Sequence, residues 1–282
     1  MQRFRKSTIS EITDSRRLHQ NPYAYLDSVG SFDAISLNYE TKKQLHASPY
    51  KKPSNNKSIT TVEQKVQDLH KTIWKKRHAL WPEGVPSDPV ELLDPKFALE
   101  YLDYDLEMSE YLGEYYSHDS SIEAAGILDR TAKRISISNR LPKDTLRFTT
   151  AHELGHVILH NQTMMHRDRA IDGTNPKNIP REPIEFEADK FAALFLMPEK
   201  LVRQRFRLTF GLDKFVLTED TAFALDPKKS IDQFRKDNNP HNLARILAET
   251  SYYNGNQINS LASQFKVSVG AMAIRIKELN LI

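Results

Sequence analysis

The sequence predicts an α+β fold that is mostly helical, with one small sheet and a helix-turn-helix-like unit at its C-terminal end. Apolar residues recur at helical spacing over much of the chain after residue 60, as they do from Val62 to Ile73. The run from Ile135 to Ser138 alternates apolar and polar side chains instead, as a half-buried strand does. Only nine glycines occur in 282 residues, which argues against a fold rich in tight turns, such as a sandwich or a propeller.

Composition restricts both the class of protein and the chemistry of any metal site. Apolar residues make up 39% of the chain and charged residues 27%, as in ordinary globular proteins. No apolar run is long enough for a membrane span, and the basic N-terminus has no apolar segment after it that would predict a secretory signal. The chain contains no cysteine, so only His, Asp and Glu could bind a metal, and a reducing, cytoplasmic location is expected.

Three regions are expected along the chain. Residues 1–60 form an N-terminal extension, and its last part, Ser48 to Thr60, is rich in Ser, Asn, Lys and Pro and reads as a linker. Residues 61–200 hold the core of the protein. Residues 201–282 form a helical C-terminal region with loops near 211–230 and 237–241.

The elements of the core follow from periodicity and from the position of proline. Pro142 is placed to open one helix and Pro183 another, since proline suits the first helical turn. The expected order is a helix over 62–73, a short helix over 90–101, a β-like region over 106–139, a helix over 143–160, a polar loop over 161–181 and a helix from 183 to the Met197-Pro198 break.

The helix over 143–160 carries an HExxH motif, formed by His152, Glu153 and His156. Residues four apart lie on one helix face about one turn apart, so both imidazoles can reach one ion. In this motif the two His bind zinc and the Glu acts as general base toward a water molecule. The pattern therefore predicts a metal-dependent hydrolase site.

A catalytic zinc site needs a third protein ligand. The downstream candidates are His160, His166, Asp172, Glu182, Glu185, Glu187 and Asp189. His160 is displaced along the helix from His152, and Glu187 points away from Glu185 because two residues span more than half a helical turn. Glu185 is the favoured ligand, with Asp189 one turn later placed to accept a hydrogen bond from a ligating imidazole. The residue that stabilises the oxyanion stays open among His160, His166 and Tyr252.

Two segments together resemble a known family. RFTTAHELGHVILH is followed by EFEADKFAALFLMP, and the pair looks like the ImmA/IrrE family of zinc metallopeptidases, of the gluzincin class. Arg147-Phe148 before the motif and Leu196-Met197-Pro198 at the end also fit, and the resemblance extends over roughly residues 60–282. It assigns His152, His156 and Glu185 as ligands, Glu153 as general base and Asp189 as the partner of a ligand.

The resemblance also implies a fold, a cofactor and a substrate. It implies a mostly helical, zincin-like metallopeptidase with a small antiparallel sheet and one zinc ion per chain, although such sites also accept Mn²⁺ or Fe²⁺. An edge strand with Arg134, Ile135, Ser136 and Ile137 would then pair with an extended substrate. Family members cleave DNA-binding repressors and so derepress genes of mobile elements, stress responses or defence loci. A helix-turn-helix repressor is the protein substrate implied here.

The spacing of apolar residues from Ile258 to Ile276 is typical of a helix-turn-helix. Its second helix would present Val269, Gly270, Ala273 and Ile274 where base-reading side chains belong. DNA binding is therefore not favoured over a structural or partner-binding role. The alternative to a peptidase is a zinc-stabilised regulator that binds DNA or a repressor without cleaving it.

Overall fold

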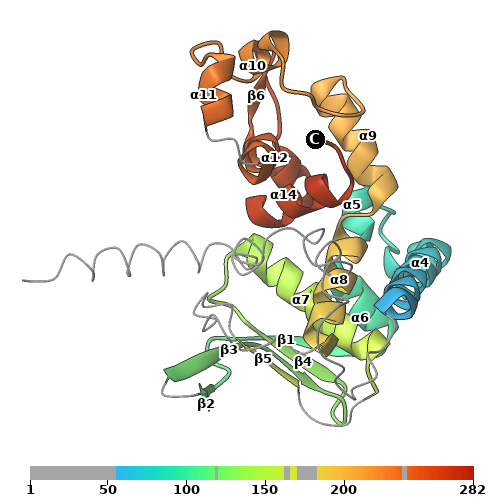
Figure 1. Cartoon of the computed structure of the whole chain (residues 1–282). Coiled ribbons are helices and arrows are strands. Elements are labelled where there is room, and N and C mark those ends of the chain that lie inside the picture. Colours follow the sequence, from blue (N-terminus) through green and yellow to red (C-terminus); the bar gives the residue numbers. More distant parts are fainter. Residues whose placement is uncertain (1–54, 118–119, 162–165, 170–182, 237–239) are drawn as a thin grey trace, which may run out of the picture.

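The computed structural model describes residues 55–117, 120–161, 166–169, 183–236 and 240–282. Helices dominate, and one sheet is confined to the first half of the described chain, which confirms the mostly helical α+β fold. Figure 1 shows the sheet at one end, α7 and α8 beside it, and the C-terminal helices at the other end. Residues 1–54 of the expected 1–60 extension lie outside the described residues.

The core of the protein combines five helices with the sheet. Its helices are α4 (Asn55–Leu80), α5 (Pro89–Leu92), α6 (Pro95–Tyr101), α7 (Lys143–Leu159) and α8 (Pro183–Leu196). Its strands are β1 (Asp105–Ser109), β2 (Glu114–Ser117), β3 (Ser120–Asp129), β4 (Arg134–Ser138) and β5 (His166–Arg169).

Four elements differ from the expectation. Helix α4 begins at Asn55, within the segment read as a linker, because Asn, Lys and Ser lower helix stability only slightly. The helix expected over 90–101 is two helices, since Asp94 caps a new helix at Pro95. Strand β5 lies inside the expected loop over 161–181. Strand β1 runs parallel to β4, so the sheet is mixed rather than wholly antiparallel.

The prediction that β4 is an edge strand is wrong. Arg134, Ile135, Ser136 and Ile137 pair with β1 on one side of the strand and with β3 on the other. Both backbone edges of β4 are thereby occupied, and the side chains of Ile135 and Ile137 are fully buried. Alternation of apolar and polar residues indicates a strand with a buried face but does not reveal its neighbours. No substrate can therefore add to β4.

Strand β5 lies on the outside of the sheet. It pairs antiparallel with β3, with Gly126 opposite Asp168 and a register shift between Ala124 and Gly126. Among the strands that the structure describes, β3 is its only partner. Within the described residues, one backbone edge of β5 is therefore not paired with another strand.

The C-terminal region contains α9 (Glu199–Phe210), α10 (Glu219–Leu225), α11 (Ile231–Lys236), α12 (Pro240–Glu249), the hairpin β6 (Tyr252–Tyr253) and β7 (Asn256–Gln257), α13 (Leu261–Phe265) and α14 (Val269–Glu278). Lys266, in a left-handed conformation, turns the chain between α13 and α14. Two helices joined by a tight turn thus lie in the segment for which a helix-turn-helix-like unit is expected.

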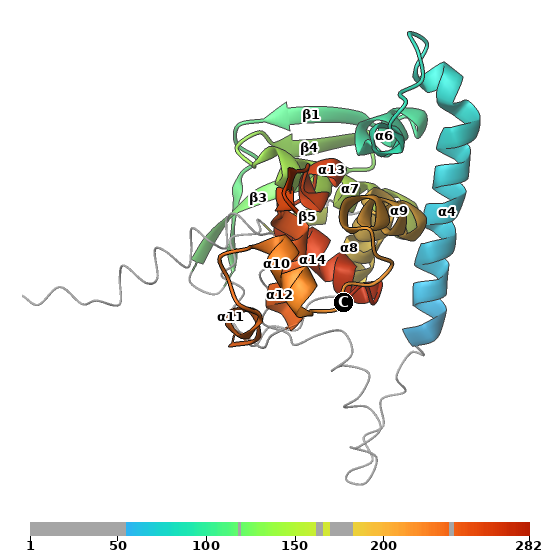
Figure 2. The ribbon, with the colours of Figure 1, turned by 90° about the horizontal axis from the view of Figure 1, so that it is seen from above.

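A continuous apolar core joins the two parts. It extends from Val62 on α4 through Phe191 on α8 to Ile276 on α14. Figure 2 shows α4 along one side of the molecule, with α8 and α14 inward of it. Buried Arg275 of α14 donates from Nε to the carbonyl oxygen of Met197 at 3.0 Å. The C-terminal helices therefore pack as part of one body with the end of α8. No helix of the described residues has the length and apolar character needed to cross a membrane.

Candidate metal centre

Helix α7 places His152, Glu153 and His156 in the interior of the protein. Pro142 occupies the N-cap and α7 then runs to Leu159, so the HExxH motif lies in a regular helix as predicted. The three residues are each at most 1% exposed. Buried Arg147, earlier on α7, fixes the helix by donating hydrogen bonds to the carbonyl oxygens of Val90 and Leu93.

Helix α8 crosses α7 closely enough to bring its first turn to the two imidazoles. A Cβ added at Gly155 would lie 3.1 Å from the carbonyl oxygen of Ala188, so any larger side chain would push the helices apart. Ala188 itself is fully buried at this crossing. Glu185 lies one turn earlier on α8, where the crossing directs its carboxylate toward α7.

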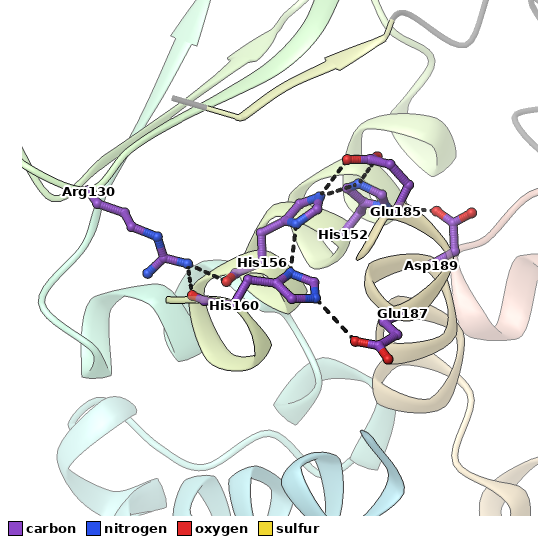
Figure 3. Close-up of polar contacts among 7 residues, drawn as sticks. All are labelled: Arg130, His152, His156, His160, Glu185, Glu187 and Asp189. Atoms are coloured by element: carbon purple, nitrogen blue, oxygen red, sulfur yellow. Dashed lines mark hydrogen bonds and ion pairs between the residues drawn. The ribbon is translucent and has the colours of Figure 1, made fainter. Parts of the chain in front are cut away.

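Three side chains converge on one point (Figure 3). Nε2 of His152 and Nε2 of His156 are 3.0 Å apart. Oε2 of Glu185 lies 3.3 Å from the first nitrogen and Oε1 lies 3.4 Å from the second. These residues form a group that could hold a metal ion, and two imidazoles with a carboxylate are the donor set of several catalytic zinc sites. The donors present therefore fit the metal that the family resemblance implies.

The protonation states suit metal binding. Burial lowers the pKa of His156 to about 4, although the contact with Glu185 opposes this. Burial acts to raise the pKa of Glu185, but its close polar contacts with His152 and His156 hold that pKa well below its usual range. At neutral pH the site thus offers a neutral imidazole and an ionised carboxylate, the forms that a divalent ion requires.

Asp189 contacts the first imidazole from the side opposite the converging atoms. Its Oδ1 lies 2.7 Å from Nδ1 of His152. A carboxylate only accepts hydrogen bonds, so Nδ1 of His152 carries the proton and Nε2 keeps its lone pair toward Glu185. Through this contact Asp189 would hold His152 in the tautomer that a metal requires.

His160 and Glu187 lie beside the site without entering the group of three candidate ligands, and the contact between them was not expected from the sequence. Nδ1 of His160 lies 3.0 Å from Nδ1 of His156, and Nε2 of His160 lies 3.3 Å from Oε2 of Glu187. Glu187 does point away from Glu185, but it meets His160 at the end of α7. The repeat of His at 152, 156 and 160 was the available signal for this contact.

Two other candidates for oxyanion stabilisation are not placed at the site. Tyr252 lies on the β6 hairpin next to α10, in the C-terminal region. The side chain of His166 lies outside the described residues, as does Asp172.

Glu153 lies beneath the sheet. A Cβ added at Gly126 of β3 would lie 2.7 Å from Oε1 of Glu153 and 3.2 Å from its Cγ. The Glu153 side chain is therefore packed directly against the backbone of β3, at the residue that pairs with β5. Strand β3 therefore contacts both Glu153, the candidate general base, and β5.

Together, an HExxH helix, a Glu from a second helix and an adjoining small sheet define a metallopeptidase with a zincin-like fold. Residues 104–213 match the family model of the IrrE N-terminal-like domain, peptidase family M78. This match agrees with the family resemblance, over a shorter stretch than the 60–282 expected from the sequence. No curated protein matches the chain significantly.

Proposed function

We propose that the protein is a cytoplasmic, zinc-dependent endopeptidase that cleaves a regulatory protein, a helix-turn-helix repressor. The observation that carries the peptidase activity is the convergence of His152, His156 and Glu185 beside buried Glu153. The repressor as substrate, and derepression of a mobile-element, stress or defence locus, rest on the family resemblance.

The residues divide the chemistry among them. When bound by His152, His156 and Glu185, zinc supplies Lewis acidity that polarises the scissile carbonyl and lowers the pKa of water to about 7. Glu153 removes a proton from the attacking water and passes it to the leaving amine. Its burial against β3 restricts the carboxylate to few positions, as a proton-transfer group requires.

The free edge of β5 supports a site for the substrate backbone. An extended peptide could add to this edge as a further strand, with main-chain hydrogen bonds providing affinity. Since β5 pairs with β3 opposite Gly126, only β5 would lie between such a peptide and β3, the strand that covers Glu153. This edge takes the place of β4, whose two edges are occupied.

DNA reading by α14 has little support. A recognition helix must expose one face to the major groove. Five residues of α14 from Gly270 on are buried, as is Arg275, which hydrogen-bonds to Met197 and Glu278. These are Gly270, Ala271, Met272, Ala273 and Ile276. We therefore assign the C-terminal unit a structural role in the proposal.

Cleavage of a candidate repressor by the purified Glu153→Gln variant tests the proposal. Gln keeps the size of the side chain but cannot take a proton, so we expect zinc binding to persist and cleavage to be lost. Exposed Glu199→Gln, which removes a carboxylate paired only with Arg203 in the described structure, is the matched control. Wild-type cleavage by Glu153→Gln would overturn the assignment. Binding to promoter DNA in a mobility-shift assay, without any cleavage by the wild type, would favour the non-catalytic regulator.

A further inference from the structure

A chain of two hydrogen bonds leads from the imidazole of His156, through His160, to Glu187 of α8. Nδ1 of His156 meets Nδ1 of His160, and Nε2 of His160 meets the carboxylate of Glu187 (Figure 3). His160 is only 7% exposed, so water does not readily replace these contacts. None of the proposed catalytic steps uses either His160 or Glu187.

When His160 is neutral, the donors and acceptors along this chain set the proton positions of both rings. The ionised carboxylate of Glu187 can only accept, so the proton of a neutral His160 lies on Nε2. Nδ1 of His160 then has a lone pair and can only accept, so Nδ1 of His156 must donate. This leaves the lone pair of His156 on Nε2, which lies 3.4 Å from Oε1 of Glu185.

The geometry at the end of α7 holds His160 in place. His160 is the C-cap and has left the helical conformation, with φ −116° and ψ 136°, so its ring is not confined to the direction of the helix. Arg130, in the turn between β3 and β4, donates from Nη2 to the carbonyl oxygens of both His156 and His160. A cation at the last carbonyl groups of a helix is also favoured by the helix dipole.

We propose that Glu187 and His160 are positioning residues that hold His156 in the tautomer that presents Nε2 to the metal. Asp189 holds the proton of His152 on Nδ1 by direct contact. Glu187 holds the proton of His156 on Nδ1 in the same way, but acts through the imidazole of His160. Two carboxylates of α8, four residues or fewer from Glu185, thus set the proton positions of both imidazoles of α7. The inference rests on the proposed function, because it requires a metal bound at His152, His156 and Glu185.

The chain from Glu187 through His160 to His156 is called the relay below. Zinc affinity, measured by competition with a chromophoric chelator, tests the relay in a double-mutant cycle. Removing a hydrogen-bond partner of a metal ligand costs about 10- to 100-fold in affinity. We expect Glu187→Ala to weaken zinc binding about tenfold and His160→Phe to do the same. Because both act through one chain, the double variant should bind no more weakly than the weaker single variant. The control is exposed Glu199→Ala, which should bind zinc like the wild type.

The outcomes separate this inference from its alternatives. Additive losses in the double variant would mean that Glu187 acts only through its charge, and wild-type affinity of Glu187→Ala would mean that it does not act at all. Either result overturns the relay. Failure of the wild-type protein to bind zinc would instead overturn the proposed function.

A second measurement does not depend on the folding of any variant. Nitrogen-15 NMR of the zinc-loaded wild-type protein reports which ring nitrogen of each His carries the proton. The relay requires the proton on Nε2 of His160 and on Nδ1 of His156. A His160 ring protonated on Nδ1 would overturn it.

Discussion

Gly126 of β3 lies so close to Glu153 of α7 that a Cβ at position 126 would be 2.7 Å from Oε1 of Glu153. The same Cβ would be 3.0 Å from Cδ1 of Ile137, so the added atom has little room on either side. The strand therefore needs glycine at this position, because the space is occupied by the carboxylate of the candidate general base.

Gly126→Ala should lower catalysis without removing the metal. The new methyl group would displace the carboxylate of Glu153, and a displacement near 1 Å can cost about 100-fold in rate. Zinc binding should change little, because the three atoms nearest to the added Cβ belong to Glu153 and Ile137 and not to the three proposed ligands. Steady-state cleavage and zinc competition measure the two effects separately. Shortening the base with Glu153→Asp should remove most of the effect of Gly126→Ala, and an unchanged effect in that background would contradict the steric explanation.

Glu185→Ala and Asp189→Ala should both weaken zinc binding, but unequally. Asp189 contacts the Nδ1 atom of an imidazole and not the converging ligand atoms, so its loss should cost about 10- to 100-fold in affinity. Glu185 lies against both Nε2 atoms, and its removal should cost more than that because a ligand itself is lost. Competition with a chelator gives both affinities. Equal losses, or a larger loss in Asp189→Ala, would argue against Glu185 as the third ligand.

Arg275→Met should destabilise the protein by about 1–3 kcal/mol, because it leaves the buried carbonyl group of Met197 without this donor, while the partly buried carboxylate of Glu278 keeps Lys190 as a donor. Arg275 donates to Met197 at 3.0 Å and to Glu278 at 2.8 Å. The matched control is Arg207→Met, since Arg207 pairs with Asp213 at the surface, and its effect should stay within about 0.5 kcal/mol. Urea unfolding monitored by circular dichroism gives both values. Similar values for the two variants would mean that the contact between α14 and the end of α8 adds little.

His70 should make the folded protein less stable in mild acid. It lies on α4, its Nε2 is 3.0 Å from the carbonyl oxygen of Phe195, and burial lowers its pKa. As the pH falls below the ordinary value of 6.5, the unfolded chain binds a proton that folded His70 does not bind, so stability falls. In His70→Gln, which can still donate to Phe195, the drop in melting temperature between about pH 7.5 and about pH 5.5 should be smaller. An equal drop in both proteins would exclude His70 as the source.

Local patterns were sufficient for much of the site. The spacing of His152 and His156 places both rings on one face of any helix, and Pro142 and Pro183 mark where the two helices begin. The helical spacing of Glu185 and Asp189 likewise indicates Glu185 as a candidate ligand and Asp189, one turn later, as a hydrogen-bond partner of a ligating imidazole. Each of these inferences depends on contacts within one turn of helix, which the chain cannot alter by folding.

Contacts between elements were the part that local patterns could not supply. The pairing of β1 with β4 removed the expected edge strand, and β5 formed an edge in a segment with no strand-like alternation. Glu187 was placed away from the site because its direction was judged only relative to Glu185. Its partner, His160, follows the last residue of α7 and has an extended backbone, so helical geometry does not give its direction.

The sequence by itself determined which side chains α7 and α8 carry on each face, because helical geometry follows from the order of residues. Only the tertiary structure decided that Glu185 meets both imidazoles, that Gly126 meets Glu153 and that β5 lies at the edge. The physical reason is that these relations depend on how closely two elements approach. That approach is set by small residues such as Gly155 and Ala188 at the crossing of α7 and α8, not by the period of either helix.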